Sequence, residues 1–97
     1  MIRWSPRAVA DLEYICERIS RDSDAYACLF AKRVMTLVSS LPEFPFLGRM
    51  VPEYKDDNIR EKIYQDYRIV YRLRGKDVEI AAICHGSRLL KSAYERP

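Results

Sequence analysis

The chain has 97 residues, of which 48% are hydrophobic and 32% are charged, and it contains no low-complexity run and no repeat. No apolar stretch approaches the roughly 20 residues that cross a membrane, and residues 1–12 lack the apolar centre of a signal peptide. The composition therefore excludes a membrane-spanning protein. It predicts one globular domain over residues 1–97, located in the cytoplasm.

The formal net charge of +3 is concentrated in the second half of the chain. Residues 1–45 contain equal numbers of acidic and basic side chains, so the whole excess lies in residues 46–97. A basic half suggests a polyanionic partner.

The chain contains three cysteines, Cys16, Cys28 and Cys84. An odd number at unrelated spacings does not indicate a disulfide framework. Because free cysteine side chains prefer buried positions, we expect core thiols in a reducing compartment.

The N-terminal half predicts a short strand, MIRW, followed by two helices. Ser5 is a suitable N-cap and Pro6 occupies the first helical position. The polar segment RDSD then separates two amphipathic stretches, and Pro42 ends the second. Because the link is short, the two helices should form an antiparallel hairpin. The apolar residues that recur with helical spacing are Val9, Leu12, Ile15, Cys16 and Ile19 in the first helix and Ala27, Phe30, Val34, Leu37 and Leu41 in the second.

The C-terminal half predicts a loop over residues 42–57 and then three strands, NIREKIY, YRIVYRLR and DVEIAAIC. The segment RGKD is typical of a tight turn between the last two strands. Two helices followed by an antiparallel meander predict an α+β fold, in which an N-terminal helical hairpin covers one face of a small, mainly antiparallel sheet.

Side-chain alternation predicts how the first two strands of the meander pair. A two-residue turn at residues 65–66 would mix apolar and charged side chains on both faces, whereas a three-residue turn at residues 65–67 separates them. We therefore expect the longer turn. The helix-covered face then holds Ile59, Ile63, Ile69, Tyr71, Leu73, Val78, Ile80, Ala82 and Cys84. The open face holds Arg60, Lys62, Tyr64, Arg68, Arg72, Glu79, Ile83 and His85.

The predicted open face could bind a phosphate backbone, because arginine presents a fork of donors that matches phosphate oxygens. An ordinary solvated sheet face is the alternative. Only Glu79 would balance the cations in this arrangement, which favours an anionic ligand.

Other chemistry is weakly indicated. His85 is the only histidine, and Glu53 is an isolated loop carboxylate. The chain lacks the ligand spacing of a metal site and the glycine-rich loop of a phosphate cradle, so we expect no metal and no cofactor.

The segments GRMVPEY, NIREKIYQDYRIVYR and VEIAAICHGSR, preceded by two helices, resemble the RelE/ParE superfamily of type II toxin–antitoxin toxins. The resemblance spans nearly the whole chain. It implies one of two targets, since RelE-like members cleave mRNA on the ribosome and ParE-like members poison DNA gyrase. It also implies a cognate antitoxin, which we expect to be acidic.

The resemblance carries several RelE-type functional residues onto this chain. Arg68 matches a basic residue of the sheet, Arg88 an arginine beyond the last strand, and Tyr94 a tyrosine near the C-terminus. His85 resembles a late histidine of some relatives. The basic residues expected to bind RNA or phosphate are Arg60, Lys62, Arg72 and Arg49.

These matches favour a metal-independent endoribonuclease in which a ribose 2′-oxygen attacks the adjacent phosphate. Arg68 and Arg88 would converge on one anion site and stabilise charge, while His85 and Tyr94 would transfer protons or stack on a base. Two other hypotheses stay open, a non-nuclease inhibitor of DNA gyrase and a non-toxic basic binding module.

Overall fold

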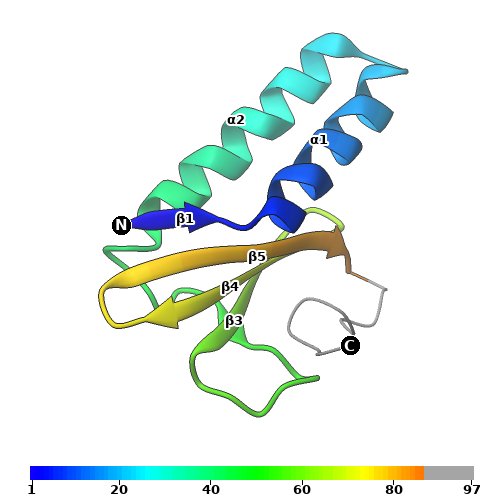
Figure 1. The fold of residues 1–97 in the computed structure, drawn as a ribbon. Helices are drawn as coiled ribbons and strands as arrows, with labels where there is room; N and C mark the ends of the chain where they lie inside the picture. Colours follow the sequence, from blue (N-terminus) through cyan, green and yellow to red (C-terminus); the bar gives the residue numbers. More distant parts are fainter. Residues whose placement is uncertain (87–97) are drawn as a thin grey trace.

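Two helices and five strands follow one another over residues 1–86, the part of the chain that the computed structural model describes (Figure 1). None of these helices is long and apolar enough to cross a bilayer. The elements are β1 (Ile2–Trp4), α1 (Pro6–Ser20), α2 (Asp24–Ser40), β2 (Arg49–Met50), β3 (Ile59–Tyr64), β4 (Tyr67–Arg74) and β5 (Asp77–His85).

Both helices begin at serine caps. The Ser5 hydroxyl accepts a hydrogen bond from the Ala8 amide at 3.0 Å, and the Ser23 hydroxyl accepts one from the Tyr26 amide at 3.1 Å. Each cap satisfies an amide that has no partner within the first turn. α2 begins at Asp24, with three residues between it and the end of α1, and the two helices pack against each other, which confirms the predicted helical hairpin.

The strands form one sheet in the order β1-β5-β4-β3-β2. β1 runs parallel to β5, and the other neighbours are antiparallel. The predicted α+β architecture is confirmed, and the helices lie over one face of the sheet (Figure 1). One expectation was wrong: the segment predicted as loop contains β2, which pairs through Arg49 and Met50 with the edge of β3.

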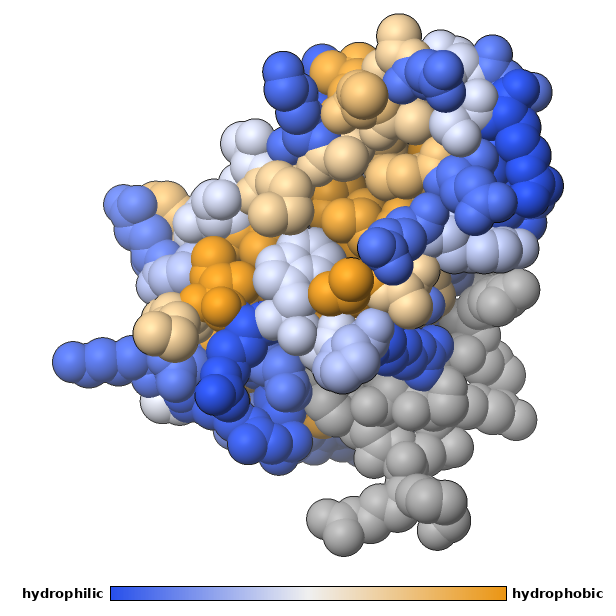
Figure 2. Space-filling model, turned by 45° about the horizontal axis from the view of Figure 1, so that its top comes forward, coloured by the Kyte–Doolittle hydropathy of each residue, from blue (hydrophilic) through white to orange (hydrophobic). Residues whose placement is uncertain are grey.

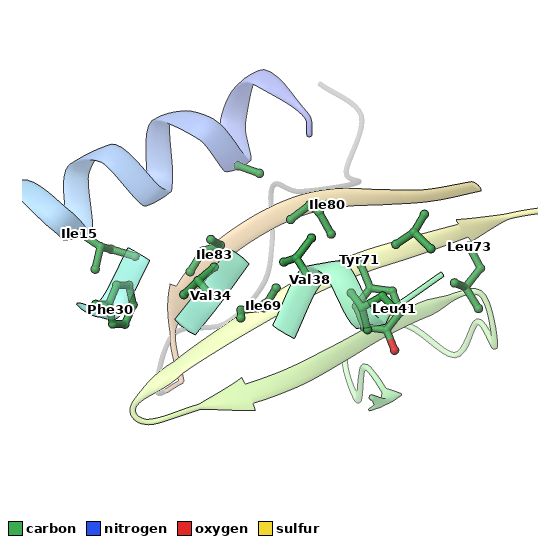
Figure 3. Close-up of a cluster of buried hydrophobic side chains, with 12 residues drawn as sticks. Ile15, Phe30, Val34, Val38, Leu41, Ile69, Tyr71, Leu73, Ile80 and Ile83 are labelled. Carbon is green, nitrogen blue, oxygen red and sulfur yellow. The ribbon is translucent and has the colours of Figure 1, made fainter. Parts of the chain in front are cut away.

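The main core lies between the helices and the sheet (Figure 3). α1 contributes Ile15, and α2 contributes a row of apolar side chains that face β4 and β5. The buried residues of this cluster are Ala8, Ile15, Phe30, Val34, Val38, Leu41, Ile69, Tyr71, Leu73, Val78, Ile80 and Ile83. Val9, predicted to belong to the buried stripe of α1, is instead exposed.

The turn between β3 and β4 has two residues, so the predicted three-residue turn is wrong. Tyr64 pairs with Tyr67, and Ile63 pairs with Arg68. Gln65 adopts a positive φ of 53° to close this turn. A shift of one residue moves every side chain of a strand to the other face. The pairs Arg60–Tyr71 and Lys62–Ile69 therefore place Arg60 and Lys62 on the helix side, not beside Arg68.

A register shift between Val70 and Tyr71 changes the alternation of β5 as well. Ile80 and Ile83 both reach the helix-side core, although a regular strand would place them on opposite faces. A bulge of this kind inserts one extra residue and reverses the faces beyond it. As a result, Ala82 and Cys84 lie on the face away from the helices, where Ile83 and His85 were predicted. Ile83 and His85 lie on the helix side, where Ala82 and Cys84 were predicted.

The second sheet face is covered too, contrary to the prediction of an open face. A second buried cluster there combines residues of three strands with Val51, and Tyr54 packs against it. Its members are Val51, Ile59, Val70, Ala81, Ala82 and Cys84. Apolar residues are therefore buried on both faces of the sheet. For this reason, a register chosen to separate apolar from charged side chains in the β3–β4 hairpin was the wrong one.

Candidate functional site

Arg68 lies at the centre of an ionic cluster on the sheet face that points away from the helices. Its Nη1 and Nη2 donate to the two carboxylate oxygens of Glu53, each at 2.8 Å. Its Nε donates to Oε1 of Glu61 at 2.6 Å. All three nitrogens of this guanidinium group therefore bond to carboxylates, and only 5% of the residue is exposed.

Glu61 links this buried arginine to the surface. It lies on β3 with 1% of its surface exposed, and its Oε2 accepts a hydrogen bond from Nε of Arg49 at 2.7 Å. The Arg49 side chain is 64% exposed. Two arginines and two carboxylates thus form a cluster without net formal charge, which we call the Arg68 cluster (Arg49, Glu53, Glu61 and Arg68).

The electrostatics of the cluster favour a charged, fixed Arg68. The hydrogen bonds that Arg68 donates to Glu53 raise the pKa of its guanidinium, burial opposes this, and Glu61 raises the pKa further. Paired buried charges need such bonds, because an unpaired charge in this position would be strongly disfavoured. The cluster connects the loop residue Glu53 to Arg68 in the middle of the sheet, so it fixes the loop on the sheet and has a structural role.

Arg60 makes a second set of contacts with the segment 46–57, which also contains Glu53. Its Nη1 donates to the Gly48 carbonyl at 3.0 Å and its Nε to the Asp57 carbonyl at 2.9 Å. Its guanidinium also lies 4.5 Å from the ring centre of Phe46. These contacts use Arg60 to hold residues 46–57 against β3.

Tyr71 completes this set of contacts from the core. Its hydroxyl donates to the Pro45 carbonyl at 2.9 Å and accepts from the Gly48 amide at 2.8 Å. Burial raises the pKa of this phenol. Side chains of β3 and β4 therefore hold the loop at several points along its length.

Of the basic residues predicted to bind phosphate, Arg49 is linked to Arg68 through Glu61, whereas Lys62 and Arg72 are not part of the Arg68 cluster. Lys62 pairs with Ile69 on the helix side of the sheet. Arg72 shares the face of Arg68 but lies across from Glu79 on β5. The predicted cation-rich face is thus divided between the two faces of the sheet, and carboxylates neutralise Arg49 and Arg68 on one of them.

His85 lies in a different environment at the end of β5. Its ring centre is 5.8 Å from that of Tyr67, and it lines a pocket of about 310 Å³ between α1 and β5. Asp11 in this pocket accepts a hydrogen bond from the Ile83 amide at 2.9 Å. Because Tyr67 and Arg68 are consecutive strand residues, His85 and Arg68 belong to opposite faces of the sheet.

Two members of the predicted catalytic set, Arg88 and Tyr94, lie outside the described residues. Their convergence with Arg68 stays a prediction. Within residues 1–86, no group of three or more His, Cys, Asp or Glu side chains could hold a metal ion.

Sequence reasoning missed Glu61 and judged Glu53 to be isolated. The first error follows from the register, because the predicted three-residue turn placed Glu61 on the helix-covered face. The second has another cause, since Glu53 reaches Arg68 from a loop whose course the strand pattern does not predict. An acid between two isoleucines in IREKI is itself a signal, since a buried carboxylate requires a cationic partner. Arg68 is the cation that a two-residue turn brings to the same face.

Comparisons with known proteins agree with this fold. Residues 2–90 match the family described as "ParE toxin of type II toxin-antitoxin system, parDE". The chain is 35% identical over 86 residues to "Putative toxin Y4kP" of Sinorhizobium fredii, covering 87% of this chain and 85% of that protein. It also resembles a solved structure titled "Chromosomal ParDE TA system from P. aeruginosa". The TM-score is 0.71 at 20% identity, over 87% of this chain and 92% of that one.

Proposed function

The chain belongs to the ParE toxin family of type II toxin–antitoxin systems, and from this premise we propose that it inhibits DNA gyrase rather than cleaving mRNA. The endoribonuclease favoured by the matched residues would need a free sheet arginine to stabilise a phosphorane. The gyrase inhibitor needs no such group. The observation that favours the gyrase inhibitor is that Arg68 is buried and bonded to two carboxylates.

Arg68 is poorly suited to bind a phosphate. An RNA phosphate would have to displace carboxylate groups that hold all three guanidinium nitrogens at 2.6–2.8 Å. It would also have to approach the negative charges of Glu53 and Glu61 in a buried position, where like charges repel strongly. These costs support a structural role for Arg68.

The placement of His85 supports the same proposal. A nuclease needs its proton-transfer group and its charge-stabilising group within reach of one phosphate. His85 belongs to the helix-side face and Arg68 to the opposite face, so the pair does not surround a common space. Arg88 and Tyr94 could bind nucleic acid without restoring that pair.

The family also implies a cognate antitoxin. The acidic residues expected in this partner have no access to Arg68, which is buried and bonded to Glu53 and Glu61. Figure 2 shows hydrophobic residues gathered in a band along the helices, with hydrophilic residues on both sides. An amphipathic antitoxin segment that covers such a band, with acids toward the exposed cations, is consistent with this surface.

Direct assays of the two targets test the proposed activity. The purified toxin, freed from its antitoxin, is added to gyrase with relaxed plasmid and, separately, to ribosomes translating a defined mRNA. We expect supercoiling to fall with toxin concentration while primer extension finds intact mRNA. Adding the antitoxin back should restore supercoiling, which controls for contaminating activities. Ribosome-dependent cleavage of mRNA with unaffected supercoiling would contradict the proposal.

A further inference from the structure

Two of the three cysteines line one groove on the surface of the helical hairpin. Cys16 of α1 is partly buried, and Cys28 of α2 is exposed. Both line a groove between the two helices, together with Glu13, Glu17, Ser20, Asp24, Ala27 and Ala31. Neither thiol belongs to the Arg68 cluster or to the His85 pocket, so the function proposed above gives them no role.

The hairpin register places these two thiols opposite each other. The chain reverses at residues 21–23, between α1 and α2. In an antiparallel pair of helices, residues equally distant from the centre of the turn lie at the same height. Cys16 and Cys28 are each six residues from Asp22, and the groove residues Ser20 and Asp24 follow the same rule.

Small residues at this seam allow the helices to approach closely. Ala27 and Ala31 line the groove beside Cys28. Packed helix axes lie about 8–10 Å apart, and Cα atoms lie about 2.3 Å from each axis. Cα atoms on the line between two such axes would be about 3.4–5.4 Å apart, so residues beside this line can reach the range of about 4.4–6.8 Å in which a disulfide can form. Burial raises the pKa of the Cys16 thiol, and the neighbouring Cys28 thiol raises it further.

We propose that Cys16 and Cys28 form an oxidisable dithiol that closes to a disulfide between α1 and α2. Hydrogen peroxide would oxidise the exposed Cys28 to a sulfenic acid, releasing water. The Cys16 sulfur then attacks the Cys28 sulfur, forming the S–S bond and releasing a second water. In total, two thiols and one peroxide yield one disulfide and two waters. Disulfides in reducing compartments are usually transient and redox-sensing.

Cys84 provides an internal control. It is buried on the far side of the sheet in the second apolar cluster, where peroxide has little access to its thiol. We expect this thiol to stay reduced under peroxide concentrations that oxidise the pair. The inference is independent of the cellular target, because it depends only on the helical hairpin.

Peptide mapping of the full-length toxin tests the proposal. The reduced protein is treated with hydrogen peroxide, unfolded in an alkylating reagent and digested with trypsin, which places the three cysteines on three separate peptides. We expect a mass loss of about 2 Da from the monomer, a linked peptide joining Cys16 to Cys28, and an alkylated Cys84. The midpoint of thermal unfolding should rise by roughly 5–15 °C because the cross-link restricts the unfolded chain.

Three variants distinguish the disulfide from other oxidation products. Cys28→Ser and Cys16→Ser should each abolish the linked peptide and the rise in melting temperature, while Cys84→Ser should retain both. Dithiothreitol should reverse the change in the wild-type chain. The proposal is overturned if peroxide yields only cross-links between two chains, links through Cys84, or a sulfinic acid at Cys28 with Cys16 still alkylated.

Discussion

Removing the buried guanidinium of Arg68 should destabilise the protein strongly. Among the described residues, the Arg68→Ala substitution leaves the buried Glu61 paired with the exposed Arg49 alone, and it removes both hydrogen bonds between Arg68 and Glu53. Breaking a buried ion pair by removing one partner costs about 3–5 kcal/mol. A domain of this size has a free energy of unfolding of about 5–15 kcal/mol, so the variant loses a large share of its stability.

Urea unfolding followed by far-UV circular dichroism measures this loss. Arg74→Ala is the matched control, because Arg74 lies on the same strand and is exposed; its effect should stay within about 0.5 kcal/mol. Glu53→Gln should cost less than Arg68→Ala, about 1.5–3 kcal/mol, since the Glu53 side chain is 23% exposed. A decrease of under about 1 kcal/mol in the free energy of unfolding of Arg68→Ala would refute the structural role of the Arg68 cluster.

Three further outcomes test the loop contacts and the buried groups. Tyr71→Phe should lower the free energy of unfolding by about 1–3 kcal/mol in chemical denaturation, because Gly48 and Pro45 lose their buried hydrogen-bond partner; an unchanged midpoint would contradict this. Gly48→Ala should lower the melting temperature and displace the loop, since its Cβ would clash with the Glu61 carbonyl and the Tyr71 hydroxyl; the wild-type melting temperature would show that no clash occurs. The pKa values of Tyr71 and Cys84 are both raised in the folded protein. Their contribution to stability is therefore complete below about pH 8.5 and is lost as the pH rises through the folded pKa values. Melting temperatures measured across this pH range should show the decline, and Cys84→Ala should make the decline smaller.

The fold could be predicted from the sequence because local signals agree with the tertiary structure. Ser5, Pro6 and Ser23 mark the helix starts, and the helical spacing of apolar residues identifies most of the main core. The short edge strand β2 could not be predicted, because two residues in a loop rich in proline carry no periodic pattern.

The candidate site was predicted only in part. Arg68 was identified and placed on the correct face, but the prediction that Arg60 and Lys62 lie beside it depended on a hairpin register that one residue decides. Its predicted exposure failed because a second buried cluster covers that face. Gln65 accepts a positive φ without being glycine or asparagine, so the turn carries no local signal for a two-residue connection. The bulge opposite Val70 likewise has no glycine to mark it. Long-range pairing of Glu53 and Glu61 with Arg68, not local preference, accounts for the observed arrangement.

The central claim is that the Arg68 cluster stabilises the fold and does not bind or cleave RNA. A variant that removes the buried charges together, Arg68→Met with Glu61→Leu and Glu53→Gln, tests this claim most directly, because apolar replacement of a buried ion pair is often neutral for stability. The measurement is gyrase supercoiling with the purified variant after circular dichroism has confirmed a cooperative thermal transition. The account predicts that the folded variant inhibits supercoiling at the same concentration as the wild-type toxin. A folded variant that has lost its toxicity, beside a wild-type chain that cleaves mRNA on ribosomes, would contradict it.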